Sequence, residues 1–351
     1  MAEVDLHGDQ WPYVLTLLPT DLETEARACG ALRRARGVKG AAELLRLFLA
    51  YGVTRLSLKG VVAWAVATGV SSISAPALYY RLRDSTAWLG RLLAKVLSMN
   101  LAPIHGPSGY HLRVIDATVI CGPGATGTEW RVHAVADPTA GSLVNIEITD
   151  CHGGEGLTRA AVQPGDLVVG DRAYGHARGI AAAVRDGADV LVRINPDTIR
   201  LYTAGGQRAD LAWLEPQVPA VGAVELDLQM PEPPENWRSH QAWPLRRAAS
   251  WTHVRLIAIR PREGSLIWVL TTAPRERLDK VTALEVYRLR WQIELLFKRL
   301  KTLLDFGELP AHTEPLVRAW LLARLLAAAL ADRLVNIEPA FSPWGYGIGV
   351  K

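Results

Sequence analysis

The chain has 351 residues, 49% of them hydrophobic and 21% charged, which is typical of a globular protein with two domains or one domain plus an insertion. Its net charge of +4 favours an anionic partner without requiring one. Three cysteines (Cys29, Cys121 and Cys151) are too few and too scattered for a disulfide framework or a zinc site. The polar N-terminus does not resemble a signal peptide, and the apolar run 319–330 is too short to cross a membrane. We therefore expect a cytoplasmic protein with no membrane partner.

Residues 1–108 are predicted to form a helical domain. An apolar helix is expected over 41–51, and Ser57 and Ser74 are the expected N-caps of helices over 58–68 and 77–83. Two helices joined by a short turn, the second ending in Arg81 and Arg83, favour a DNA-binding helix-turn-helix. Twelve Lys and Arg against three acids between residues 25 and 99 support this interpretation. The alternative is an ordinary helical pair with a solvated basic edge.

Near residue 109 the pattern changes from helix to strand. β-Branched and apolar runs predict three consecutive antiparallel strands, over 110–120, 129–137 and 142–150. A short helix, a strand, a longer helix and a fifth strand are expected over 157–161, 166–170, 176–185 and 189–194. This order of elements predicts an α/β sheet with a meander on one side, spanning 109–196.

A β-rich insertion is predicted over 197–264. Its expected strands are 198–203, 223–228 and 254–259, and the proline-rich stretch 230–236 is expected to be a surface loop. The last part, 265–336, begins with a strand over 266–272 and continues with two helices, 279–305 and 313–335. A C-terminal tail, 337–351, follows.

Two aspartates occupy positions that favour a site. Asp116 lies in the middle of an apolar strand, where a carboxylate is costly unless it opens to a cleft or meets a cation. Asp171 ends another apolar strand, and ligands bind at the carboxyl ends of strands in open sheets. Taken singly, Asp116 could pair with a buried arginine, and Asp171 could cap a turn.

The helix over 279–305 supplies a third acid. Tyr287, Arg290, Glu294 and Lys301 fall at i, i+3, i+7 and i+14, so they share one face. A solvated charged face is the simplest interpretation of such a helix. Together with the two strand-borne aspartates, however, Glu294 completes an oxygen-only ligand set suited to Mg²⁺ or Mn²⁺. Two such ions can support phosphodiester displacement.

These residues carry a family resemblance. The spacing of Tyr287, Arg290, Glu294 and Lys301 resembles the Tyr-Arg-Glu-Lys signature of DDE transposases of the insertion-sequence-4 family. Ile115-Asp116-Ala-Thr, Gly170-Asp171-Arg-Ala-Tyr-Gly175 and the β-rich insertion are also similar to patterns of that family. The resemblance covers about 110–335. It implies a ribonuclease-H-like catalytic core that the insertion interrupts.

The resemblance also implies roles for the residues. Asp116, Asp171 and Glu294 would be the catalytic metal ligands. The residues expected to contact DNA are Tyr287, Arg290, Lys301, Lys298, Arg172, Tyr174, Arg81 and Arg83. The cations around Glu294 are thus expected to hold phosphates and not to be its salt-bridge partners.

The implied function is a metal-dependent DNA transposase. It would bind terminal inverted repeats, cleave at the transposon ends and join the 3′-hydroxyl to target DNA, as a homodimer on double-stranded DNA at the nucleoid. Two alternatives stay open. One is a ribonuclease-H-like nuclease that hydrolyses DNA without joining it, and the other is a non-catalytic DNA-binding regulator derived from a transposase.

Overall fold

A computed structural model describes most of the chain. It covers residues 11–54, 56–99, 103, 105–107, 109–120, 130–234, 236–237, 244–261, 265–303 and 313–335. Within its last two helices, the side chains of residues 292, 293, 295–303, 332, 334 and 335 are outside the description. The predicted tail over 337–351 lies outside the described residues as well.

The N-terminal part is helical, as predicted. Its helices are α1 (Trp11–Thr16), α2 (Leu22–Ala28), α3 (Ala41–Val53), α4 (Leu58–Ala67), α5 (Ala75–Asp84) and α6 (Thr86–Ser98). Both predicted serine caps are confirmed: Ser57 Oγ accepts from Gly60 N at 3.2 Å, and Ser74 Oγ accepts from Ala77 N at 3.4 Å. These hydroxyls satisfy amides that the first helical turn leaves unpaired.

One mixed sheet organises the rest. Its strands are β1 (His111–Ile120), β2 (Trp130–Asp137), β3 (Ser142–Asp150), β4 (Asp166–Gly170), β5 (Asp189–Arg193), β6 (Ala223–Pro231), β7 (Trp251–Ile259) and β8 (Ile267–Thr271). The spatial order is β3-β2-β1-β4-β5-β8-β7-β6. The pairs β1–β4 and β4–β5 are parallel and the others antiparallel, so the predicted meander β1–β2–β3 is confirmed.

The β-rich segment extends this sheet and does not form a sheet of its own. β8 pairs with β5, and β7 and β6 follow outward. The strand predicted over 198–203 is wrong: Tyr202 makes only isolated bridges to Arg208 and Gln229. The surface loop predicted over 230–236 also starts too early, because Met230 and Pro231 are buried and still pair with β7.

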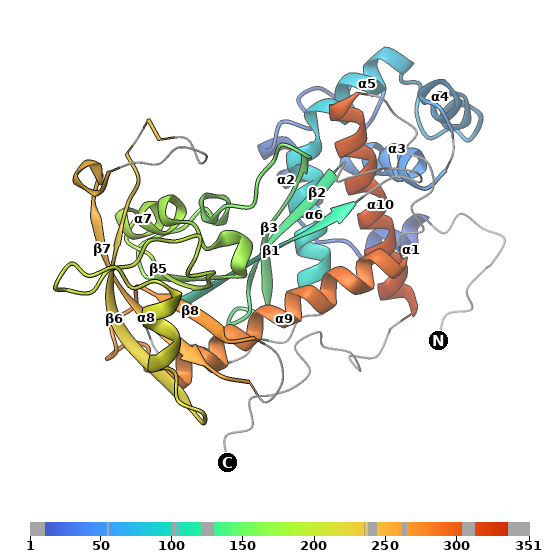
Figure 1. Ribbon diagram of the computed structural model, residues 1–351. Helices are drawn as coiled ribbons and strands as arrows, with labels where there is room; N and C mark the ends of the chain where they lie inside the picture. Colours follow the sequence, from blue (N-terminus) through green and yellow to red (C-terminus); the bar gives the residue numbers. More distant parts are fainter. Residues whose placement is uncertain are drawn as a thin grey trace.

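Helices cover both faces of the sheet (Figure 1). On one face lie α9 (Lys280–Leu303), α10 (Glu314–Val335) and the N-terminal helices, packed against a core that includes Val114 and Val169. On the other lie the short helix η1 (Leu157–Ala160), α7 (Ala177–Arg185) and α8 (Leu211–Leu214), over Ile115 and Val168. Successive strand residues thus alternate between the two cores.

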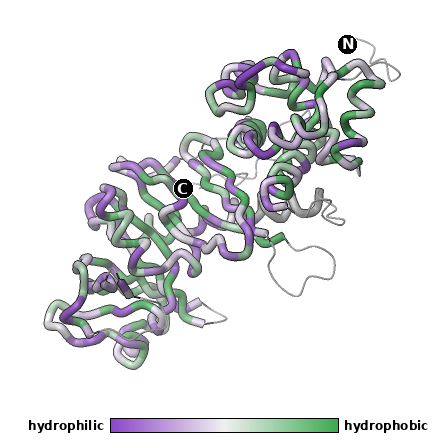
Figure 2. Tube along the Cα trace, turned by 90° about the horizontal axis from the view of Figure 1, so that it is seen from above, coloured by the Kyte–Doolittle hydropathy of each residue, from purple (hydrophilic) through white to green (hydrophobic). Residues whose placement is uncertain are grey.

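The N-terminal helices and the β6–β7 edge lie at opposite ends of an elongated molecule (Figures 1 and 2). α10 packs against both α3 and α6, so the hydrophobic core is continuous across the domain boundary predicted near residue 108. Among the described helices, none combines the length and apolar character that crossing a bilayer demands.

Candidate catalytic site

Asp116 is a buried carboxylate on the central strand β1. Alternation along β1 places it on the α9 face, next to Ile115, whose side chain enters the opposite core. The side chain of Asp116 is 11% exposed, and its Oδ1 accepts from Ala117 N at 2.8 Å. Burial raises the pKa of Asp116 to about 6; the Ala117 amide and Arg290 oppose this rise, and the charges of Asp171 and Glu294 add to it.

Asp171 follows directly after β4, the parallel neighbour of β1. Its Oδ1 accepts from Ala173 N at 2.8 Å and so caps the short helix η2 (Arg172–Tyr174). Asp171 therefore caps a turn through Oδ1, and this cap does not decide whether it is also a site residue. The charge of Asp171 also contributes to the raised pKa of Asp116, which places the two carboxylates in one electrostatic environment.

The helix α9 brings the third acid to the same place. α9 packs over β1, β4 and β5. From it, Arg290 reaches Asp116, with Nη1 3.3 Å from Oδ2, and its Nη2 lies 3.6 Å from Glu294 Oε2. The guanidinium carbon of Arg290 is also 5.9 Å from the ring centroid of Tyr287. Arg290 is thus an ion-pair partner of both acids, contrary to the expectation that it does not pair with Glu294.

The donor set suits a divalent cation in its chemistry. Asp116, buried and with a raised pKa, and Glu294 pair with the same guanidinium at 3.3 and 3.6 Å, and the charge of Asp171 adds to the raised pKa of Asp116. Their charge is incompletely balanced, and hard oxygen ligands are those that Mg²⁺ and Mn²⁺ select. Among the described residues, no three His, Cys, Asp or Glu side chains are grouped closely enough to hold an ion in this arrangement. Arg290 occupies part of the space between them.

The other residues predicted to contact DNA differ in accessibility. Arg172 is exposed beside Asp171. Tyr174 is 1% exposed and belongs to the core under α7, so its side chain is not available to DNA in this structure. The sequence did not reveal this because a Tyr in a loop after a strand carries no periodicity. Lys298 and Lys301 lie on α9, but their side chains are outside the described residues.

The two arginines of α5 have different environments. Arg81 donates to the backbone carbonyls of Ala31, Arg34 and Arg36, so it holds the segment after α2. That structural role was not predicted. Arg83 is exposed, with Nε 2.7 Å from Asp84 Oδ1. Of the two, only Arg83 presents its charge mainly to solvent.

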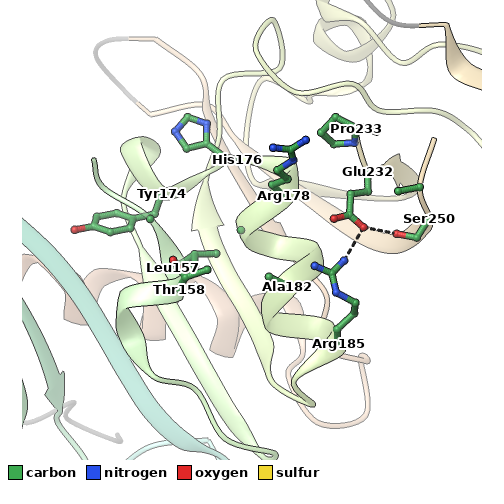
Figure 3. A pocket seen from close by; sticks show the side chains of 13 residues that line it. Leu157, Thr158, Tyr174, His176, Arg178, Ala182, Arg185, Glu232, Pro233 and Ser250 are labelled. Atoms are coloured by element: carbon green, nitrogen blue, oxygen red, sulfur yellow. Dashed lines mark hydrogen bonds and ion pairs between the residues drawn. The ribbon is translucent and has the colours of Figure 1, made fainter. Parts of the chain in front are cut away.

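A pocket of about 690 Å³ lies elsewhere, against α7 (Figure 3). Its lining includes His176, Arg178 and Glu232, and Glu232 accepts from Arg185 at 2.7 Å and from Ser250 at 2.8 Å. Glu232 is the single acid among the lining residues, so this pocket lacks the several acids of the site under α9.

A mixed sheet with Asp116 inside β1, Asp171 after the neighbouring strand β4 and Glu294 on the covering helix α9 defines an α/β protein with an acidic site. Residues 107–330 match the family model described as "Transposase DDE domain". The chain is 34% identical over 361 residues to "Putative transposase InsL for insertion sequence element IS186A" of Escherichia coli (strain K12). It is 33% identical over 362 residues to "Transposase for insertion sequence element IS421" of Escherichia coli. Each alignment covers 97% of this chain and 97% of the relative. The chain therefore belongs to the insertion-sequence transposases with a DDE domain.

Proposed function

We propose that the protein is a metal-dependent transposase of the insertion-sequence-4 family. It binds the terminal inverted repeats of its element, cleaves DNA at the ends and joins the 3′-hydroxyl to target DNA. The observation that carries the proposal is that Arg290 pairs with both Asp116 on β1 and Glu294 on α9, while Asp171, directly after the neighbouring strand β4, adds through its charge to the raised pKa of Asp116.

Asp116, Asp171 and Glu294 would hold Mg²⁺ or Mn²⁺. When bound, the two ions would activate water or a 3′-hydroxyl and stabilise the leaving oxygen. In this proposal Arg290 turns from the carboxylates to a phosphate next to the scissile bond, where its planar fork can bind two oxygens. Tyr287, Lys298 and Lys301 on the same helix and the exposed Arg172 extend this phosphate contact.

The topology supports a ribonuclease-H-like core. Strands β3-β2-β1-β4-β5 form an antiparallel meander joined to parallel strands, with Asp116 on β1 and Asp171 directly after the adjacent β4. In the proposed division, residues 1–108 bind DNA through α4 and α5, 109–196 and 265–336 form the core, and 197–264 are the insertion. The active form is a homodimer on double-stranded DNA at the nucleoid.

The test uses end-cleavage assays with Mg²⁺ on the full-length protein. Asp116→Asn, Asp171→Asn and Glu294→Gln should each abolish cleavage while leaving binding to inverted-repeat DNA within about twofold. Glu285→Gln is the matched control, because Glu285 lies exposed on α9 away from this face. Cleavage retained in all three variants would refute the assignment. Cut DNA with no joined product would instead favour the nuclease alternative.

A further inference from the structure

The connection between α2 and α3 carries a dense positive charge. Residues 33–36, here called the basic loop, contain Arg33, Arg34 and Arg36 and no acid. All three arginines are exposed, and none of them has an ion-pair partner in the part of the chain that the structure describes. Because three guanidiniums this close together repel one another, an anionic partner would stabilise them.

The backbone of the basic loop is held from α5. Arg81 donates to the carbonyl of Ala31 and to that of Arg36, each at 3.3 Å. It donates to the carbonyl of Arg34 as well. Arg81 thus binds backbone oxygens of the loop, and the side chains of Arg34 and Arg36 stay exposed to solvent.

A second attachment fixes the end of the basic loop to the turn between α4 and α5. Ser71 Oγ donates to the carbonyl of Gly37. Gly37 has φ +74°, and a Cβ there would lie 3.0 Å from Ile73 Cα, so the two backbones are in close contact. Leu32 and Val38, on either side of the loop, are 1% and 2% exposed. A loop ordered in advance loses less conformational entropy when it binds a partner.

The basic loop lies beside the outward face of α5. Pro76, Tyr80 and Arg83 are exposed at i, i+4 and i+7, so they share one face of this helix. Arg81, which holds the loop, follows Tyr80 and is turned from it by about 100° around the helix. α4 and α5 lie at the end of the molecule away from the β6–β7 edge (Figure 1). When a helix enters the major groove of DNA, segments beside it reach the backbone phosphates.

We propose that the basic loop binds backbone phosphates of double-stranded DNA beside the groove that α5 enters, with Arg33, Arg34 and Arg36 as the contacts. Such contacts position a protein on the duplex and carry no sequence information. This inference rests on the proposed function, because its partner is the DNA that a transposase binds.

The test measures binding of the full-length protein to an inverted-repeat duplex and to a duplex of unrelated sequence over a range of salt concentrations. The triple variant Arg33→Gln/Arg34→Gln/Arg36→Gln should bind both duplexes about 10- to 100-fold more weakly. The slope of log K against log salt should become shallower by about 2 to 3, or about 0.9 for each lost phosphate contact. The preference for the inverted repeat should stay within about threefold of wild type, since both duplexes offer the same phosphates.

Arg91→Gln is the matched control for the single variants Arg34→Gln and Arg36→Gln. It removes the same formal charge from an exposed position of α6. Its salt slope should equal that of wild type, whereas each loop variant should lose about 0.9. The triple variant Arg33→Lys/Arg34→Lys/Arg36→Lys keeps the charges and should keep most of the wild-type slope. If the triple Gln variant has a lowered urea midpoint, the two single variants decide by the same change of slope.

Wild-type affinity and salt slope in the triple Gln variant, together with weaker binding by Arg83→Gln, would overturn this inference and leave the proposed function intact. Weaker binding to the inverted-repeat duplex alone, with an unchanged slope, would also overturn it, because the loop would then contact bases. Failure of the wild-type protein to bind either duplex would refute the proposed function itself.

Discussion

Arg290 and Asp116 form a partly buried ion pair across 174 residues of sequence, with Nη1 3.3 Å from Oδ2. The same guanidinium reaches Glu294 at 3.6 Å. A cation of the chain thus pairs with two of the three carboxylates that are proposed to bind a divalent ion. Arg290 and the metal should compete for the same oxygens, and DNA phosphates should relieve the competition by drawing Arg290 away.

Removing the charge of Arg290 should therefore tighten metal binding while impairing catalysis. Arg290→Gln is expected to bind Mn²⁺ about 3- to 10-fold more tightly than wild type without DNA. This change corresponds to about 1 kcal/mol of binding free energy, which competition from Arg290 removes in the wild type. Calorimetric titration measures this affinity. Arg288→Gln removes the same formal charge from an exposed position of α9 and controls for general electrostatics. Equal effects of the two substitutions would show that Arg290 does not compete.

The burial of Asp116 should lower the free energy of unfolding of the metal-free protein at neutral pH. Its pKa is raised to about 6 from 3.8, so between these values the folded protein holds a proton that the unfolded chain has lost. The contribution of Asp116 to stability therefore falls as pH rises through this window, by up to about 3 kcal/mol. Asp116→Asn should raise the free energy of unfolding by a similar amount at pH 7.5 and by little at pH 4, measured by urea titration.

Asp137→Asn provides the opposite case for comparison. Burial acts to raise the pKa of Asp137, but hydrogen bonds from Thr139, the Ala140 amide and Arg113 lower it overall. The stability that Asp137 contributes is present above its unfolded pKa and is lost in acid. This substitution should destabilise the protein at pH 7.5. Destabilisation by Asp116→Asn at that pH would contradict the burial argument.

His133 should make the protein sensitive to mild acid. It is 2% exposed, and Nε2 lies 3.0 Å from Thr149 Oγ1. Burial lowers its pKa to about 4 from 6.5, so between these values only the unfolded chain is protonated. The contribution of His133 to stability is therefore lost as pH falls from 6.5 towards 4, by about 3 kcal/mol, and it opposes the contribution of Asp116 over the same range. The urea midpoint of His133→Gln should therefore rise relative to that of wild type as pH falls over this range, whereas that of His152→Gln, at an exposed position, should follow wild type.

Substitution of Arg81 should affect folding stability, whereas substitution of Arg83 should affect DNA binding. Arg81→Gln removes donors to three backbone carbonyls, so it should lower the free energy of unfolding by about 1–3 kcal/mol. Arg83→Gln should leave stability nearly unchanged and weaken binding to end DNA with a smaller salt dependence. Urea titration and salt-dependent binding assays measure the two effects. Equal stability losses would assign both residues to the scaffold.

The sequence predicted those parts of the structure that local patterns determine. Ser57 and Ser74 cap helices as expected, and the meander and the position of Asp171 after β4 follow from apolar runs and turns. The sequence did not predict which distant segments pair with each other. Neither the addition of β6 and β7 to the same sheet nor the contact of Arg290 with Asp116 is encoded in any local spacing. The burial of Tyr174 depends on α7 and η1 packing over it.

The docking of the N-terminal helices on α10 depends on close backbone contact at Gly52. A Cβ there would lie 2.8 Å from Ala323 Cβ and 2.9 Å from Arg324 N, so α3 and α10 would have to separate. Gly52→Ala gains up to about 1 kcal/mol of helix propensity but should lose more to overpacking, for a net destabilisation of about 1–2 kcal/mol. Gly205→Ala is the control, since its nearest neighbour would be Thr203 Oγ1 at 3.8 Å. A stabilised Gly52→Ala protein in urea titration would show that the two helices pack less tightly than this contact requires.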